Sequence, residues 1–198
     1  DLIFSHEMGF RTLAALLYAK IFRVPLWVFW EGPLHTERRI SWVKKVLRKL
    51  VFLPFIPRWV TCGESSTAYL TSVGIDRKHI VTAQNPVDER PFREAVDPYP
   101  LDVPGPVALC VSRLTGLKGL DRLLRVVSDV QNEGRQFSLV MVGDGPERNN
   151  LEDLVRKLNI QNVQWIPNIP LEEMPSIYRS ADFLVFPTLS DVWGLVVN

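Results

Sequence analysis

Short apolar runs alternate with longer amphipathic stretches along the first 82 residues of the chain. The short runs are rich in β-branched and aromatic residues, as in buried strands, and the longer ones carry apolar residues at helical spacing. Strands are predicted at 1–5, 26–30, 59–62 and 79–82, and helices at 10–23, 40–53 and a stretch ending at Val73. We expect Ser65 or Ser66 to cap the last helix and Gly74 to close it. This alternation predicts a parallel sheet with crossover helices.

The alternation stops in a proline-rich stretch and then begins again. Six prolines lie between Asn85 and Pro106 without hydrophobic periodicity, which indicates a domain boundary. Beyond it, strands are predicted at 107–111, 137–142, 163–166 and 183–186, and helices at 119–130, 148–158 and 171–180. The predicted fold class is therefore α/β, with two Rossmann-like parallel-sheet domains. They occupy residues 1–92 and 107–198, and residues 93–106 form the linker.

Composition excludes several classes of protein. The 198 residues are 46% hydrophobic and 23% charged with a net charge of +1, which excludes a disordered chain. Two cysteines make no disulfide framework and fit a reducing compartment. No uncharged apolar run reaches the roughly 18–20 residues of a membrane-spanning helix. Because the chain opens on Asp1 rather than Met, we expect a fragment that lacks both termini of its protein.

The near-neutral charge conceals an asymmetry between the two ends of the chain. Residues 1–60 hold ten Lys and Arg against four Asp and Glu, whereas residues 61–198 hold thirteen against eighteen. The first domain is therefore basic and the second acidic.

Two cations stand in the loop after the predicted strand at 107–111. Arg113 leaves the strand end, and Lys118 lies at the mouth of the next helix, between Gly116 and Gly119. Ligands of open parallel sheets bind at the carboxyl ends of the strands, and cations beside a helix N-terminus favour anions. The pattern indicates a phosphate site; the alternative is a solvated loop with two surface cations.

Two further loops follow strands of the second domain. The sequence Gly143-Asp144-Gly145-Pro146 is either a tight strand-to-helix turn facing a ligand or an ordinary turn with Asp144 as a cap. The loop at 187–195 contains Asp191 and Trp193, and its alternative is a polar loop with a packed tryptophan. Backbone N–H groups at a second helix start would come from Gly194, Leu195 and Val196.

Together these loops resemble glycosyltransferase family 4. The motifs that carry the resemblance are Arg113-Leu114-x3-Lys118-Gly119, Gly143-Asp144-Gly145-Pro146, Ala181-Asp182, Pro187…Asp191-Val192-Trp193-Gly194-Leu195 and, before the linker, Asn85-Pro86-Val87-Asp88. Members of that family are retaining, metal-independent enzymes of the GT-B fold, in which two Rossmann-like domains face a cleft. The resemblance implies that 1–92 is the later part of an acceptor-side domain and 107–198 the earlier part of a donor domain.

The resemblance also implies roles for single residues. Arg113 and Lys118 would hold the diphosphate of a nucleotide-sugar donor and neutralise the charge on the leaving group. The amides of Gly194, Leu195 and Val196 would bind the same phosphates. Further donor contacts would come from the turn at Gly145, from Asn168 in the base-contacting loop and from Asp191, which would hold sugar hydroxyls. Asp191 stands where the family commonly has Glu, and the second acid of that motif would follow Asn198.

His6 ends the first predicted strand. A lone histidine there is either a structural hydrogen-bonding group or an acid–base group. The resemblance favours a catalytic role for His6, facing the donor sugar. Glu31 and Glu64, also near strand ends, are candidates for contacts with the acceptor.

The segment 38–52 is strongly basic. Its six cations accompany apolar residues at helical spacing, namely Trp42, Val43, Val46, Leu47 and Leu50. Such an amphipathic helix suits an anionic membrane surface. The alternative is a core-packed helix with a solvated basic face; no nucleic acid is expected as a partner.

The resemblance therefore implies a retaining glycosyltransferase of polysaccharide biosynthesis. It would move a sugar from a nucleotide-diphosphate sugar to a carbohydrate or lipid-linked acceptor, with no cofactor and no metal. We expect a cytoplasmic location at the inner face of the membrane. The alternatives are another GT-B enzyme, an epimerase or phosphorylase, and a non-catalytic membrane-associated module that binds sugar nucleotides.

Overall fold

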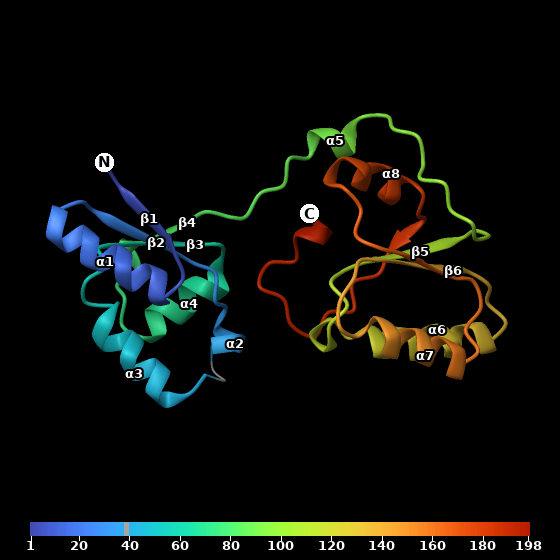
Figure 1. Cartoon of the computed structure of the whole chain (residues 1–198), viewed down its shortest axis with the longest axis horizontal. Coiled ribbons are helices and arrows are strands. Elements are labelled where there is room, and N and C mark those ends of the chain that lie inside the picture. The colour runs from blue at the N-terminus through green and yellow to red at the C-terminus, as the bar shows by residue number, and fades with distance from the viewer. Residues whose placement is uncertain (38–39) are drawn as a thin grey trace. The chain divides into compact units, whose positions relative to one another are not determined.

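The computed structural model describes residues 1–37 and 40–198, which divide into two compact units, Asp1–Pro86 and Val87–Asn198. Each unit holds one four-stranded sheet with helices packed on it (Figure 1). Every paired strand runs parallel to its neighbour. The predicted α/β class with two parallel sheets is confirmed.

Unit 1 orders its strands as they follow in the chain, β1-β2-β3-β4. The strands are β1 (Ile3–His6), β2 (Leu26–Trp30), β3 (Arg58–Thr61) and β4 (Ile80–Thr82). The helices are α1 (Phe10–Phe22), α2 (Leu34–Glu37), α3 (Trp42–Val51) and α4 (Glu64–Ser72), and η1 (Arg77–His79) is a 3-10 turn. The core gathers around two fully buried tryptophans, Trp30 and Trp59, which lie beneath α1 and α4 residues such as Leu16 and Leu70.

The start of α4 differs from the prediction. Gly63, not Ser65 or Ser66, is its N-cap residue, and no side chain caps it. Ser66 is buried in the first turn, where its hydroxyl donates to the carbonyl oxygen of Glu31 at 2.8 Å. A contact 35 residues away therefore takes the hydroxyl that a local pattern assigns to the cap.

Helix α3 exposes its apolar face. Trp42 is 74% and Leu50 65% exposed, and three more apolar side chains are also exposed, those of Val43, Val46 and Leu47. The alternative of a core-packed helix is therefore wrong. Arg38 and Arg39, predicted to belong to the basic surface, lie outside the described residues.

The membrane-facing interpretation of segment 38–52 also needs a correction, because it counted Arg48 among the six cations of the exposed basic surface. Arg48 is only 8% exposed and forms a buried ion pair with Glu37. Its guanidinium also donates to the Tyr69 hydroxyl at 3.3 Å and lies 4.8 Å from the Trp30 ring centroid. Helix α3 is thus anchored to unit 1 by a charged side chain.

Unit 2 orders its strands β7-β6-β5-β8. The strands are β5 (Val107–Val111), β6 (Ser138–Val142), β7 (Val163–Ile166) and β8 (Phe183–Leu184). The helices are α5 (Arg90–Arg93), α6 (Leu120–Asn132), α7 (Arg148–Lys157) and α8 (Met174–Arg179), with 3-10 turns η2 (Gly116–Lys118), η3 (Leu171–Glu173) and η4 (Leu195–Val197). Helices α6 and α7 cover one face of the sheet, and α8 lies on the other (Figure 1).

Both faces of the β5–β6 pair are buried, which explains the continuous apolar runs of these strands. Alternate residues of the strands belong to different cores. Cys110 and Met141 pack toward α6 and α7, whereas Leu109 and Val140 pack toward Ile177 of α8.

The segment expected as a linker, 93–106, belongs to unit 2. Tyr99, Leu101 and Val103 pack against the α8 face of the sheet, and the Tyr99 amide donates to the Ser176 carbonyl at 3.0 Å. The predicted helix at 171–180 is divided into η3 and α8, with Pro175 in the first turn of α8, where its missing N–H costs nothing.

In the part of the chain that the structure describes, no helix is long and apolar enough to span a bilayer. The longest helices, α1 and α6, have 13 residues each.

Candidate functional site

Three strand ends of unit 2 supply the polar groups of the candidate site. Arg113 follows β5, Asp144 and Gly145 follow β6, and Asn168 follows β7. These four residues line one open cavity of about 430 Å³. Arg113 and Asn168 also line a neighbouring cavity of about 310 Å³, whose wall includes Gly143 and Val196. The structure therefore brings together four of the predicted donor-binding residues, namely Arg113, Gly145, Asn168 and Val196.

The loop after β6 lies so close to the loop after β5 that only glycine fits at two positions. Gly143 has φ of +131°, and a Cβ there would lie 2.1 Å from the Ser112 carbonyl oxygen. A Cβ on Gly145 would lie 2.3 Å from the Leu114 carbonyl oxygen. The close approach lets the Leu114 amide donate to the Asp144 carbonyl at 2.9 Å, which fixes the loops on both sides of Arg113.

Arg113 is exposed, and within residues 1–37 and 40–198 its guanidinium has no hydrogen-bond or ion-pair partner. A guanidinium presents a planar fork of N–H donors that matches a phosphate or carboxylate bidentately. The side chain is thus available to an anionic ligand in the cavity that it lines.

Lys118 is held by the acid that the sequence also placed in the site. Its ammonium lies 2.5 Å from Asp191 Oδ2 and 6.0 Å from the Phe186 ring centroid, and both partners of the ion pair are mostly buried. An ammonium carries three donors, so two remain for a ligand.

Asp191 is ionised in this loop. Partial burial raises the pKa of its carboxyl, but the hydrogen bond and charge of Lys118 and the backbone N–H groups of Val192 and Gly194 outweigh it. The pKa of Asp191 is therefore below its usual value. The Val192 amide donates to Oδ1 at 2.8 Å, so both carboxylate oxygens of Asp191 hold the local loop and Lys118.

The last segment forms a single turn rather than a long helix. Gly194, with φ of +66°, precedes η4, which contains Leu195 and Val196. The Tyr178 hydroxyl of α8 donates to the Val196 carbonyl at 3.0 Å and ties the turn to unit 2. Of the three residues, Val196 lines the cavity beside Arg113.

His6 and the two weaker candidates lie in unit 1. His6 ends β1, half exposed, with Nε2 3.5 Å from Glu31 Oε2. Glu64 is exposed at the start of α4 and lies 3.7 Å from Arg77. The structure thus brings His6 and Glu31 together, whereas Glu64 pairs with Arg77.

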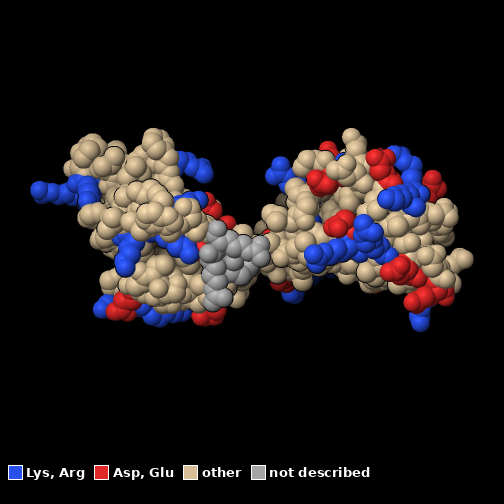
Figure 2. All heavy atoms as spheres, turned by 90° about the horizontal axis from the view of Figure 1, so that it is seen from below, with Lys and Arg blue, Asp and Glu red and all other residues tan. Residues whose placement is uncertain are grey.

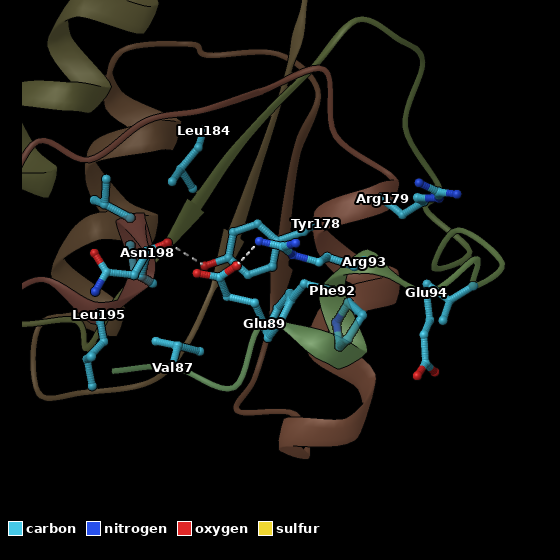
Figure 3. Close-up of a pocket in the computed structure, with 14 residues that line it drawn as sticks. Val87, Glu89, Phe92, Arg93, Glu94, Tyr178, Arg179, Leu184, Leu195 and Asn198 are labelled. Atoms are coloured by element: carbon cyan, nitrogen blue, oxygen red, sulfur yellow. Dashed lines mark hydrogen bonds and ion pairs between the residues drawn. The ribbon is translucent and has the colours of Figure 1, made fainter. Parts of the chain in front are cut away.

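A larger cavity of about 500 Å³ in unit 2 shares Val196 with the cavity beside Arg113, and Leu195 also lines it (Figure 3). Figure 3 shows its lining drawn from α5, α8 and the C-terminal segment, where Phe92 and Tyr178 meet edge to face at 5.8 Å. Sequence reasoning missed it, because α5 lies in the stretch expected as a boundary and linker. Its lining is mainly apolar, and we place the candidate site at the smaller cavities because they gather convergent polar groups.

In the described part of the chain, no group of three or more His, Cys, Asp or Glu side chains is arranged to hold a metal ion.

Comparison with known proteins matches residues 92–198 to the family described as Glycosyl transferases group 1. Among curated relatives, the GDP-mannose-dependent alpha-(1-6)-phosphatidylinositol monomannoside mannosyltransferase of Mycolicibacterium smegmatis is 32% identical over 94 residues, which are 47% of this chain and 25% of that protein. The alpha-monoglucosyldiacylglycerol synthase of Streptococcus pneumoniae is 33% identical over 88 residues, which are 44% of this chain and 20% of that protein.

Among solved structures, Anabaena HepE in complex with UDP and glucose superposes with a TM-score of 0.78 at 16% identity. The superposition covers all of this chain and 55% of HepE, so the chain spans about half the length of that protein. At this identity the likeness shows the fold, which is the predicted GT-B fold.

Proposed function

The chain belongs to the group 1 glycosyl transferases, and from this premise we propose that unit 2 holds the nucleotide-diphosphate sugar donor of a retaining enzyme of family 4. The observation that carries the proposal is Arg113, which has no hydrogen-bond or ion-pair partner among the described residues and lines an open cavity with Asp144, Gly145 and Asn168 at the carboxyl edge of the sheet. Substrates of parallel α/β sheets bind at this edge.

We assign Arg113 and Lys118 to the diphosphate. As the bond between the sugar and the nucleotide breaks, negative charge builds up on the leaving diphosphate, and two fixed cations stabilise it. The ion pair with Asp191 holds Lys118 in place and leaves two of its N–H donors for phosphate oxygens. The amides of Gly194, Leu195 and Val196 would bind the same phosphates, and Asn168 would contact the base.

The mechanism that we propose needs no metal or other cofactor, because the cations of the chain neutralise the leaving group. His6 is the proposed catalytic residue of unit 1. The acceptor is a carbohydrate or a lipid-linked molecule, and the two relatives named for a phosphatidylinositol mannoside and a diacylglycerol support the lipid-linked choice.

Sugar transfer by the full-length protein tests this proposal. Arg113→Ala and Lys118→Ala should each lower kcat/KM about 100-fold to 1,000-fold, the cost of removing one charge-stabilising donor. Arg125→Ala, the same change on the exposed face of α6, should alter it less than twofold. NMR of the product should show retained anomeric configuration. Full turnover in both site variants contradicts the diphosphate assignment, and a changed donor sugar without acceptor identifies an epimerase.

We further propose an anionic membrane surface, at the inner face of the cytoplasmic membrane, as a partner of α3. Its five exposed apolar side chains accompany three exposed lysines, Lys44, Lys45 and Lys49. Figure 2 shows Lys and Arg side chains around broad uncharged areas of the surface of unit 1. Because the buried Arg48 anchors the helix from its inner side, the apolar residues lie outward, as in helices that lie in a membrane interface.

The affinity of the protein for anionic lipid vesicles tests this second proposal. Each Lys→Glu change at the three lysines replaces an attraction of about 1 kcal/mol with a repulsion, so the triple variant should bind anionic vesicles more than 100-fold more weakly. A triple reversal at exposed cations of unit 2, Arg122, Arg125 and Lys157, is the matched control. Equal losses in the two triple variants contradict a role for α3.

A further inference from the structure

Three polar side chains meet at the carboxyl edge of the sheet in unit 1. His6 ends β1, Glu31 follows β2, and Asn85 follows β4. Glu31 lies between the other two: its Oε2 is 3.5 Å from His6 Nε2, and its Oε1 accepts a hydrogen bond from Asn85 Nδ2 at 2.8 Å. His6 and Glu31 are 25 positions apart in the sequence, and Glu31 and Asn85 are 54 apart, yet the fold brings all three into contact through Glu31.

The backbone that carries these three side chains is held in place by further contacts. The Ser66 hydroxyl of α4 donates to the Glu31 carbonyl at 2.8 Å, so the residue is held through its main chain as well as its carboxylate. The His6 ring stacks on Phe29 of β2, with centroids 5.6 Å apart and planes 26° apart. The remaining freedom of the imidazole is rotation about its side-chain bonds, which the carboxylate of Glu31 restricts.

His6 and Glu31 differ in their exposure to solvent. The Glu31 side chain is 25% exposed, whereas His6 is 48% exposed. The histidine is therefore the member that reaches solvent, and Glu31 lies behind it. A carboxylate beside Nε2 favours a proton on that nitrogen and leaves Nδ1 as the acceptor of a neutral ring.

We propose that Glu31 is a positioning residue for His6 and that Asn85 sets the orientation of Glu31. Its effect on sugar transfer rests on the proposed function, in which His6 is catalytic. Asn85 and His6 each contact the Glu31 carboxylate, so a change at Asn85 that reorients this carboxylate should also reach the imidazole, which a contact that merely stabilised the fold would not require.

NMR of the histidine ring signals in the full chain tests the transmission directly. The sequence contains three histidines, and the His6→Gln variant assigns the signal. Asn85→Ala should shift the ring signals of His6 and leave those of His79 in place. The control is Gln84→Ala at the exposed neighbouring position, which should leave the ring signals of both His6 and His79 in place. In a Glu31→Ala background, Asn85→Ala should have no further effect on His6.

Unmoved His6 signals in Asn85→Ala, or an equal shift in the Glu31→Ala background, would overturn the proposal. Turnover provides the second arm. Glu31→Ala should lower kcat about tenfold to 100-fold with donor KM within twofold, and adding it to His6→Ala should cost nothing more. If His6→Ala keeps full turnover while the NMR coupling is present, the catalytic role of His6 fails and the positioning contact stands.

Discussion

At Gly143 the loop after β6 approaches the loop after β5 so closely that a single added methyl group should disrupt the candidate site. This residue follows β6 with φ of +131°, and an added Cβ would lie 2.1 Å from the oxygen and 3.0 Å from the carbon of the Ser112 carbonyl. Carbon and oxygen atoms in ordinary contact are more than 3 Å apart, so the Ser112 peptide must move by about 1 Å. That peptide leads directly into Arg113.

The magnitude has two parts. The positive φ costs a side chain about 1–3 kcal/mol, and the overlap with Ser112 adds about 1–3 kcal/mol of overpacking strain. Gly134 provides a matched control, because its φ is +85° and a Cβ there meets nothing within 4 Å. Gly134→Ala should therefore lose only the stability that the positive φ costs. Gly143→Ala should be less stable than Gly134→Ala by about 1–3 kcal/mol, because it also overlaps with Ser112.

Urea denaturation of both variants measures this difference, provided that the slope with urea concentration is unchanged. Because the Ser112 peptide precedes Arg113, Gly143→Ala should also raise the donor KM, whereas Gly134→Ala should not. Equal free energies of unfolding for the two variants would refute the close approach of these loops.

Three more predictions concern single buried or paired groups. Arg48→Met should lower the free energy of unfolding by about 3–5 kcal/mol, because it leaves Glu37 buried without its partner, and adding Glu37→Leu should recover most of the loss in the same denaturation assay. The folded-state pKa of Asp191 is lowered, so its carboxylate stabilises the fold above the unfolded pKa of about 3.9 and loses that effect as the pH falls through the folded pKa. The difference in free energy of unfolding between wild type and Asp191→Asn should therefore shrink from pH 7 to pH 3. A difference that stays constant with pH would contradict the ion pair. Burial raises the pKa of Cys110 to about 11, so iodoacetamide at pH 8 should label it only after unfolding, as mass spectrometry would show.

The strands were largely predictable because their short apolar runs leave a direct mark on the sequence. The runs at 26–30, 107–111 and 163–166 have the predicted bounds in the structure. The ends of the helices were harder to predict, because a serine caps a helix only if its hydroxyl bonds to the first turn rather than to a distant group. Ser66 finds the Glu31 carbonyl, and the helix begins after Gly63 instead.

The side-chain pairs of the site could not be read from the sequence. Local spacing placed Arg113, Lys118 and Asp191 at strand ends, but the Lys118–Asp191 ion pair joins residues 73 positions apart. Helical periodicity likewise assigns charged residues to solvent, so the inward direction of Arg48 followed only from Glu37 and Tyr69, which the fold brings to it.

The most direct test of the donor site is calorimetric binding of nucleoside diphosphates and monophosphates of each base to the full chain. If Arg113 and Lys118 grip the diphosphate, the diphosphate of the preferred base should bind at least tenfold more tightly than its monophosphate. Arg113→Ala should reduce that preference, because Lys118 remains, and Arg125→Ala should preserve it. An undiminished diphosphate preference in Arg113→Ala, or no preference in the wild-type chain, would contradict the account.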